Sequence, residues 1–183
     1  RSLLYLAVTA EESGLLGSAY FAEYPPVDLS QVVAGFNFDA MHPRGKVKDV
    51  VVVGYGASQL EDILNRKLQK YDKYLVPDPE PEKGYFYRSD HINLSKKGVP
   101  MLYADAGIDK VEGGIIAGEQ SALKYVTEDY HQPSDEYATD WDLSGIAEHL
   151  SITAEMILDL ANSEDWPEWY EGNEFRSIRE ASR

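Results

Sequence analysis

The feature that most constrains the fold is a short apolar run that leads into two acidic residues near the start of the chain. Residues 3–8 are largely apolar and rich in β-formers, and Glu11 and Glu12 follow before Gly14. This pattern predicts a buried strand that ends in a turn, from which a helix begins. In an open α/β sheet, ligands and catalytic groups gather beyond the carboxyl ends of the strands. Acids in the first turn of a helix also complement its dipole, so this pair alone does not indicate a function.

Strand-like and helix-like segments alternate along the rest of the chain. Strands are predicted over 32–41, 47–55 and 99–104, and helices over 14–23, 58–71, 89–97 and 143–161. Ser58 and Glu61 form a predicted capping box, and Asp142 is the predicted cap of the last helix. The alternation predicts a three-layer α/β domain with a mixed, mainly parallel sheet between helices.

A single domain is predicted over 1–183, because a chain of 183 residues can bury one ordinary core. The core is predicted over 3–161. Within it, 105–138 shows little periodicity and is predicted to be a long loop. The aromatic and acidic tail, 162–183, is predicted to pack against the outside of the core.

Composition narrows the classes of function. The net charge of −15 argues against a nucleic-acid partner, because a phosphate backbone requires a basic face. No apolar run approaches the roughly 20 residues that span a bilayer, so no membrane-spanning segment is predicted. The chain has no cysteine, so any metal must be bound by His, Asp and Glu.

Three further features give the acidic pair a chemical context. Asp39 ends the segment Phe-Asn-Phe-Asp, and His131 lies in the predicted long loop within Tyr-His-Gln-Pro-Ser-Asp-Glu. A third motif, Arg-Ser-Asp-His, precedes Gly-Val-Pro at residues 98–100. Carboxylates and a neutral imidazole are the ligands expected for zinc when cysteine is absent.

The order of these four motifs resembles the co-catalytic dizinc aminopeptidases, the family of the bacterial leucyl aminopeptidases, aminopeptidase Y and glutamate carboxypeptidase. The likeness runs from residue 3 to about 161. It implies a zinc-dependent exopeptidase that hydrolyses N-terminal residues of a peptide substrate, and a secreted or periplasmic location. Glu11 resembles the general base that moves a proton from the attacking water to the leaving amine. Glu12 and His131 resemble ligands of one zinc, and Asp39 a ligand of the other.

One part of the family pattern is absent. The pattern also requires an upstream His-x-Asp and a further Asp that bridges both ions, and no His-x-Asp occurs in this sequence. The expectation is therefore a C-terminal portion of a catalytic domain, incomplete at its N-terminus, with the base and three of five protein ligands. Such a chain should bind zinc poorly and be inactive alone, because a catalytic zinc normally has about three protein ligands.

Alternatives remain at the level of function. A glutaminyl cyclase-like acyltransferase or a carboxypeptidase could use the same scaffold, and a receptor-like member would bind without catalysis. A proton-transferring Glu11 beside metal ligands argues against the non-catalytic alternative.

Other polar residues have two interpretations each. Asp90 and His91 either support the site or cap a short helix. His42 is interpreted as a loop residue and His149 as structural. Asp135 is predicted to orient the loop of His131 through backbone N–H groups.

Overall fold

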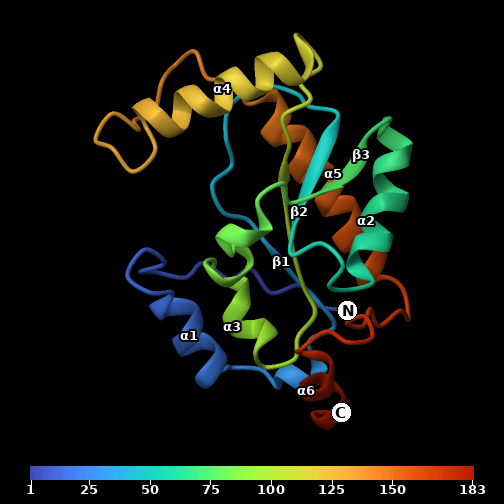
Figure 1. The fold of residues 1–183 in the computed structure, drawn as a ribbon. Coiled ribbons are helices and arrows are strands. Elements are labelled where there is room, and N and C mark those ends of the chain that lie inside the picture. Colours follow the sequence, from blue (N-terminus) through green and yellow to red (C-terminus); the bar gives the residue numbers. More distant parts are fainter.

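The computed structural model describes residues 1–183 as a mixed four-stranded sheet with helices on both faces (Figure 1). The strands are β1 (Gly35–Asn37), β2 (Asp49–Val53), β3 (Tyr74–Pro77) and β4 (Met101–Ala106). They lie in the order β1-β4-β2-β3. β1 runs parallel to β4 and β2 parallel to β3, whereas β2 and β4 are antiparallel. The predicted α/β class with a mixed, mainly parallel sheet is confirmed.

Two pairs of helices cover the sheet. α1 (Leu16–Glu23) packs on α3 (His91–Ser95), which contacts β1 and β4. On the other face, α2 (Leu60–Leu68) packs on α5 (Ser144–Ala161) (Figure 1). α4 (Gly114–Glu128) and α6 (Arg176–Ala181) complete the set. Short 3₁₀ turns lie at Leu29–Gln31, Gln69–Tyr71, Pro81–Lys83 and Tyr85–Tyr87.

The buried side chains form two clusters. The first lies between the sheet and the pair α2 and α5, and consists of Val50, Val52, Leu60, Leu64, Leu68, Leu102, Ile152, Met156 and Leu160. The second contains Ala57, Ile92, Val99, Met101, Trp169 and Phe175. The tail thus contributes two aromatic side chains to a core cluster, and the indole Nε1 of Trp169 donates a hydrogen bond to the carbonyl of Gly98 at 2.9 Å.

The predicted helix-capping residues make the expected bonds. The hydroxyl of Ser58 accepts from the N–H of Leu60 at 3.3 Å, and the carboxylate of Glu61 accepts from the N–H of Ser58 at 3.2 Å. Asp142 accepts from the N–H of Ser144 at 3.0 Å. These side chains satisfy N–H groups that a helix leaves unpaired at its start, so the local sequence fixes where α2 and α5 begin.

The predicted first strand is wrong. Residues 3–8 form no strand and pair with none of the four strands, and the side chains of Leu4 and Tyr5 are 60% and 90% exposed. A strand requires a neighbour that satisfies its backbone N–H and C=O groups, and an apolar run does not reveal whether that neighbour exists. The strand predicted over 32–41 is also shorter, because β1 comprises only Gly35–Asn37.

Three elements, β3, α4 and α6, were not predicted from the sequence. β3 lies at the edge of the sheet and ends in Pro77, where a proline is tolerated. α4 replaces part of the predicted loop 105–138, and its only buried residue is Gly118. A side chain at Gly118 would lie 1.8 Å from the carbonyl oxygen of Ile108, so this glycine allows the helix to approach the chain after β4.

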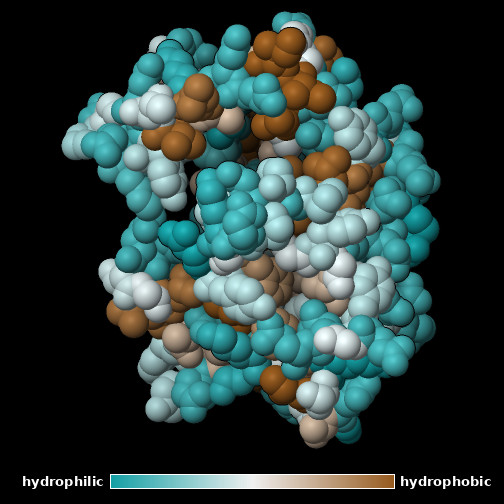
Figure 2. All heavy atoms as spheres, in the orientation of Figure 1, coloured by the Kyte–Doolittle hydropathy of each residue, from teal (hydrophilic) through white to brown (hydrophobic).

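α4 has no stripe of buried apolar residues, which explains why helical periodicity did not reveal it. Ile115 and Ile116 are 50% and 71% exposed. Figure 2 shows hydrophobic side chains gathered on the surface at this end of the molecule. None of the helices combines the length and the apolar character that crossing a membrane requires.

Candidate metal centre

Glu11 and Glu12 lie in a tight turn ahead of α1. The N–H of Leu15 donates to the carbonyl of Glu11 at 2.8 Å, and Ala10 has a left-handed φ of 58°. Adjacent side chains of a regular strand point to opposite faces of the sheet. The turn removes that alternation, so both carboxylates can serve one site.

Glu12 meets His131, which comes from the distant loop after α4. The Nε2 of His131 lies 3.0 Å from Oε1 of Glu12, and the ring of His131 stacks on that of Tyr130 with centroids 4.0 Å apart. His131 has a φ of 58°, a conformation that costs energy for a residue other than glycine. The fold therefore brings together an imidazole and a carboxylate that were predicted to bind the same zinc.

Asp39 is held by a hydroxyl. The Oγ of Ser89 donates to Oδ2 of Asp39 at 2.5 Å, and the Nδ2 of Asn37 donates to the same Oγ at 2.8 Å. Ser89 is buried, whereas Asp39 is exposed. No role was predicted for Asn37 or Ser89, although Asn37 lies in the motif Asn-Phe-Asp and Ser89 in Arg-Ser-Asp-His.

The carboxylates of this region influence one another. Burial raises the pKa of Glu11, and the negative charges of Asp39, Glu12 and Asp90 raise it further, while His131 opposes the shift. Like charges raise a carboxyl pKa because the ionised form is disfavoured. Carboxylates and an imidazole are donor types that suit a divalent cation.

The fold brings only some of the predicted zinc ligands together. No three His, Asp or Glu side chains lie close enough together to form a complete metal-binding group. Glu12 and His131 form a pair, and Asp39 stands apart from it with Ser89. The donor chemistry fits zinc, but each ion would have fewer than the three protein ligands typical of a catalytic site.

The other histidines show no ligand geometry. His91 is 1% exposed between the rings of Phe86 and Tyr103, at 4.8 and 5.2 Å, and burial lowers its pKa to about 4. His42 packs edge-on against Tyr125 at 4.5 Å, and burial with the charge of Arg44 lowers its pKa to about 4. Both rings are therefore neutral at pH 7.

His149 is 8% exposed on α5, and burial lowers its pKa. This placement fits the structural interpretation.

The contacts of Asp90 and Asp135 differ from those that were predicted. Asp90 occupies the N-cap position of α3 but makes no side-chain capping bond, and its carboxylate instead accepts from the hydroxyl of Ser18 at 2.5 Å. Asp135 accepts from the phenol of Tyr125 at 2.8 Å rather than from the backbone N–H groups that were predicted. A side chain cannot be assigned a partner from loop sequence alone when that partner lies on another element.

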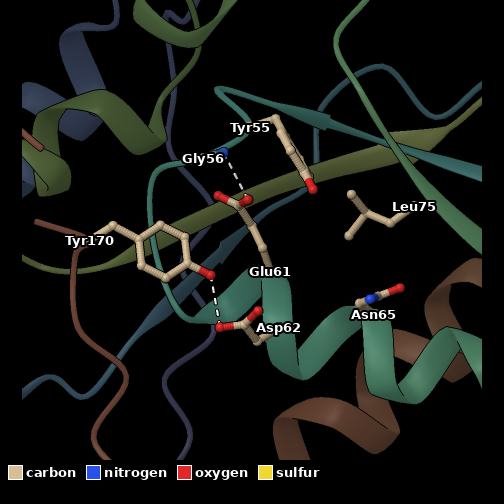
Figure 3. A pocket seen from close by; sticks show the side chains of 7 residues that line it. All are labelled: Tyr55, Gly56, Glu61, Asp62, Asn65, Leu75 and Tyr170. Atoms are coloured by element: carbon tan, nitrogen blue, oxygen red, sulfur yellow. Dashed lines mark hydrogen bonds between the residues drawn. The ribbon is translucent and has the colours of Figure 1, made fainter.

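A pocket of about 230 Å³ lies at the start of α2 and contains none of the predicted site residues (Figure 3). Its carboxylates already have partners. Glu61 accepts from the N–H groups of Gly56 and Ala57 at 2.8 and 2.7 Å, and Asp62 accepts from the phenol of Tyr170 at 2.8 Å. The bonds of Glu61 hold the loop before α2 and that of Asp62 connects α2 to the tail, so the pocket has a structural explanation.

Comparison with protein-family models matches residues 1–157 to peptidase family M28. No curated protein and no solved structure gives a match. The matched residues include Glu11, Glu12, Asp39 and His131.

Proposed function

The chain belongs to peptidase family M28, and from this premise we propose that it forms part of an aminopeptidase that removes N-terminal residues from peptides. The family supports a zinc-dependent metallopeptidase with a peptide substrate. The observation that carries the proposal for this chain is the 3.0 Å contact between His131 and Glu12, next to Glu11. That contact joins an imidazole and a carboxylate from two distant motifs at one place.

The roles follow from which carboxylates have partners. Glu12 and His131 would hold one zinc ion, and Asp39 would hold the other. Bound zinc would polarise the scissile carbonyl and lower the pKa of the attacking water. Glu11 takes part in no ion pair and no side-chain hydrogen bond. Its carboxylate is therefore free to accept a proton and pass it to the leaving amine, and its raised pKa strengthens it as a base.

The number of zinc ligands in residues 1–183 determines how tightly this chain is expected to bind zinc. It supplies the base and three ligands, whereas the family pattern includes a further His-x-Asp and a bridging Asp. We therefore propose that residues 1–183 bind zinc weakly and do not turn over peptides alone, and that the complete enzyme contains the remaining ligands.

The exopeptidase type is tested by product analysis with the complete enzyme. Release of a free amino acid from an aminoacyl anilide supports the aminopeptidase. Formation of pyroglutamate from an N-terminal glutaminyl peptide would instead indicate a glutaminyl cyclase, and release of the last residue from a peptide with a blocked N-terminus a carboxypeptidase. A receptor-like protein would give none of these products.

Ser89→Ala is expected to lower zinc affinity by about 10- to 100-fold, the effect typical of losing a partner that orients a metal ligand. The hydroxyl of Ser89 holds one oxygen of Asp39 and leaves the other free. Without it, the carboxylate can rotate and the amide of Asn37 loses its acceptor. Zinc titration by calorimetry measures the change.

Ser18→Ala is the matched control. The hydroxyl of Ser18 also donates to a carboxylate at 2.5 Å, that of Asp90, and accepts from an amide, that of Asn93, at 2.9 Å. Both serines are buried. The control is expected to lose similar stability but keep its zinc affinity, and equal losses of zinc affinity in the two variants would contradict the role of Ser89.

A further inference from the structure

Arg44 lies in the loop between Asp39 and β2, and its backbone is fixed. It forms an isolated β-bridge with Asp142, and the N–H of the next residue, Gly45, donates to the carbonyl of Asp142 at 3.1 Å. A side chain at Gly145 would lie 2.0 Å from the carbonyl oxygen of Gly45, so the start of α5 packs directly on this loop. The position from which the Arg44 side chain extends is therefore well defined.

A row of aromatic rings connects Arg44 to the predicted metal ligands. The guanidinium carbon of Arg44 lies 5.6 Å from the centroid of the Tyr125 ring. The rings of Tyr125 and Tyr130 are 5.9 Å apart, and Tyr130 stacks on His131 at 4.0 Å. Arg44 thus lies at the side of the site, two rings from His131.

The guanidinium of Arg44 has no acceptor in the protein. It takes part in no ion pair within 4.0 Å and in no side-chain hydrogen bond, although the residue is partly buried. Burial lowers its pKa, which shows that the charge is partly removed from water. A partly buried guanidinium without a hydrogen-bond acceptor in the protein is suited to an external anion.

Asp105 does not fill this role. Its charge acts on Arg44, but one of its oxygens accepts from the N–H of Ala106 at 2.7 Å. Burial raises the pKa of Asp105 to about 6, and its carboxylate makes no hydrogen bond or ion pair with Arg44. The guanidinium N–H groups of Arg44 remain available to hydrogen-bond a carboxylate of a bound ligand.

We propose that Arg44 binds a carboxylate of the peptide substrate, and that the enzyme therefore prefers peptides with a carboxylate close to the scissile bond. This proposal rests on the proposed peptidase function and names the substrate class. The carboxylate can be the C-terminus of a dipeptide or the side chain of an acidic residue, since both present two oxygens to the guanidinium fork.

The test uses nitrogen-15 NMR of the zinc-free chain, in which the Nε–H signal of Arg44 is assigned by its loss in Arg44→Gln. The probes are Ala-Ala with a free carboxylate, Ala-Ala-amide, Glu-Ala-amide and Gln-Ala-amide. We expect a carboxylate peptide to shift the Arg44 signal and to bind at least ten times more tightly than its amide counterpart. The first pair of probes tests the C-terminal source, and the second pair tests the side-chain source.

Two variants make the result specific. Arg44→Lys keeps the positive charge but loses the planar guanidinium with its paired N–H donors, so it should retain only part of the preference for carboxylates. Arg88→Gln removes an exposed arginine that also lies over a tyrosine, with its guanidinium carbon 5.7 Å from the Tyr85 ring, and should keep the full preference. Equal binding of acid and amide peptides would overturn the proposal, as would an equal loss in Arg88→Gln.

Zinc titration of the same samples separates the two proposals. If Arg44→Gln binds zinc as tightly as the wild-type chain, and the wild-type chain binds acid and amide peptides equally, only the role of Arg44 is refuted. Zinc affinity that is unchanged in His131→Ala would contradict the proposed zinc site and the substrate preference that rests on it.

Discussion

Glu11→Gln is expected to lower peptide hydrolysis by the complete enzyme by at least about 10²- to 10⁴-fold, the usual contribution of a general base. Glutamine has nearly the same shape but cannot accept the proton of the attacking water. Because Glu11 is proposed to bind no metal, the zinc content should stay the same. Steady-state kinetics and metal analysis of the same preparation measure both quantities.

Glu11→Asp provides the matched variant for this experiment. It keeps a carboxylate but shortens its reach, so we expect an activity between those of the wild type and Glu11→Gln. Unchanged activity in Glu11→Gln would contradict the role of Glu11 as the base. Loss of zinc in Glu11→Gln would instead show that Glu11 is a ligand.

Trp169→Ala is expected to lower the free energy of unfolding by about 3–5 kcal/mol, the range found when a buried aromatic side chain is truncated. Trp169 is 1% exposed, lies 5.3 Å from the ring of Phe175 and bonds to Gly98 through its indole N–H. Truncation leaves a cavity and an unpaired carbonyl. Urea unfolding followed by circular dichroism measures the loss.

Trp166→Ala is the control, because Trp166 belongs to the same tail but is only partly buried. Its ring lies 4.0 Å from the guanidinium carbon of Arg183 and 5.4 and 5.5 Å from those of Arg1 and Arg179, contacts worth about 0.5–1 kcal/mol each at an exposed site. The expected loss is therefore smaller than for Trp169→Ala. Equal losses would contradict the placement of Trp169 in the core.

Local sequence signals predicted the elements whose cause is local. The capping box of Ser58 and Glu61 and the apolar spacing of α5 each depend on residues a few positions apart, and the structure confirms both elements. The strand at β2 was equally clear, because its run of four valines has strong β propensity. The fold class followed from these elements.

The predictions failed for elements whose formation depends on residues that are distant in the sequence. Whether residues 3–8 form a strand depends on a neighbouring strand, and α4 is helical without burying an apolar face. At the site, the motifs identified Glu12 and His131, which the fold brings into contact. The hydrogen bond that the Ser89 hydroxyl donates to Asp39 could not be predicted, since the two residues meet only after β1 and α3 pack together.

A calorimetric zinc titration of three proteins tests most directly whether this chain carries zinc ligands and a separate proton-transferring base. We predict weak zinc binding by the wild-type chain, the same affinity in Glu11→Gln, and loss of that binding in His131→Ala. Two zinc ions per chain that survive dialysis would contradict the partial ligand set, and zinc affinity that is unchanged in His131→Ala would contradict the site itself.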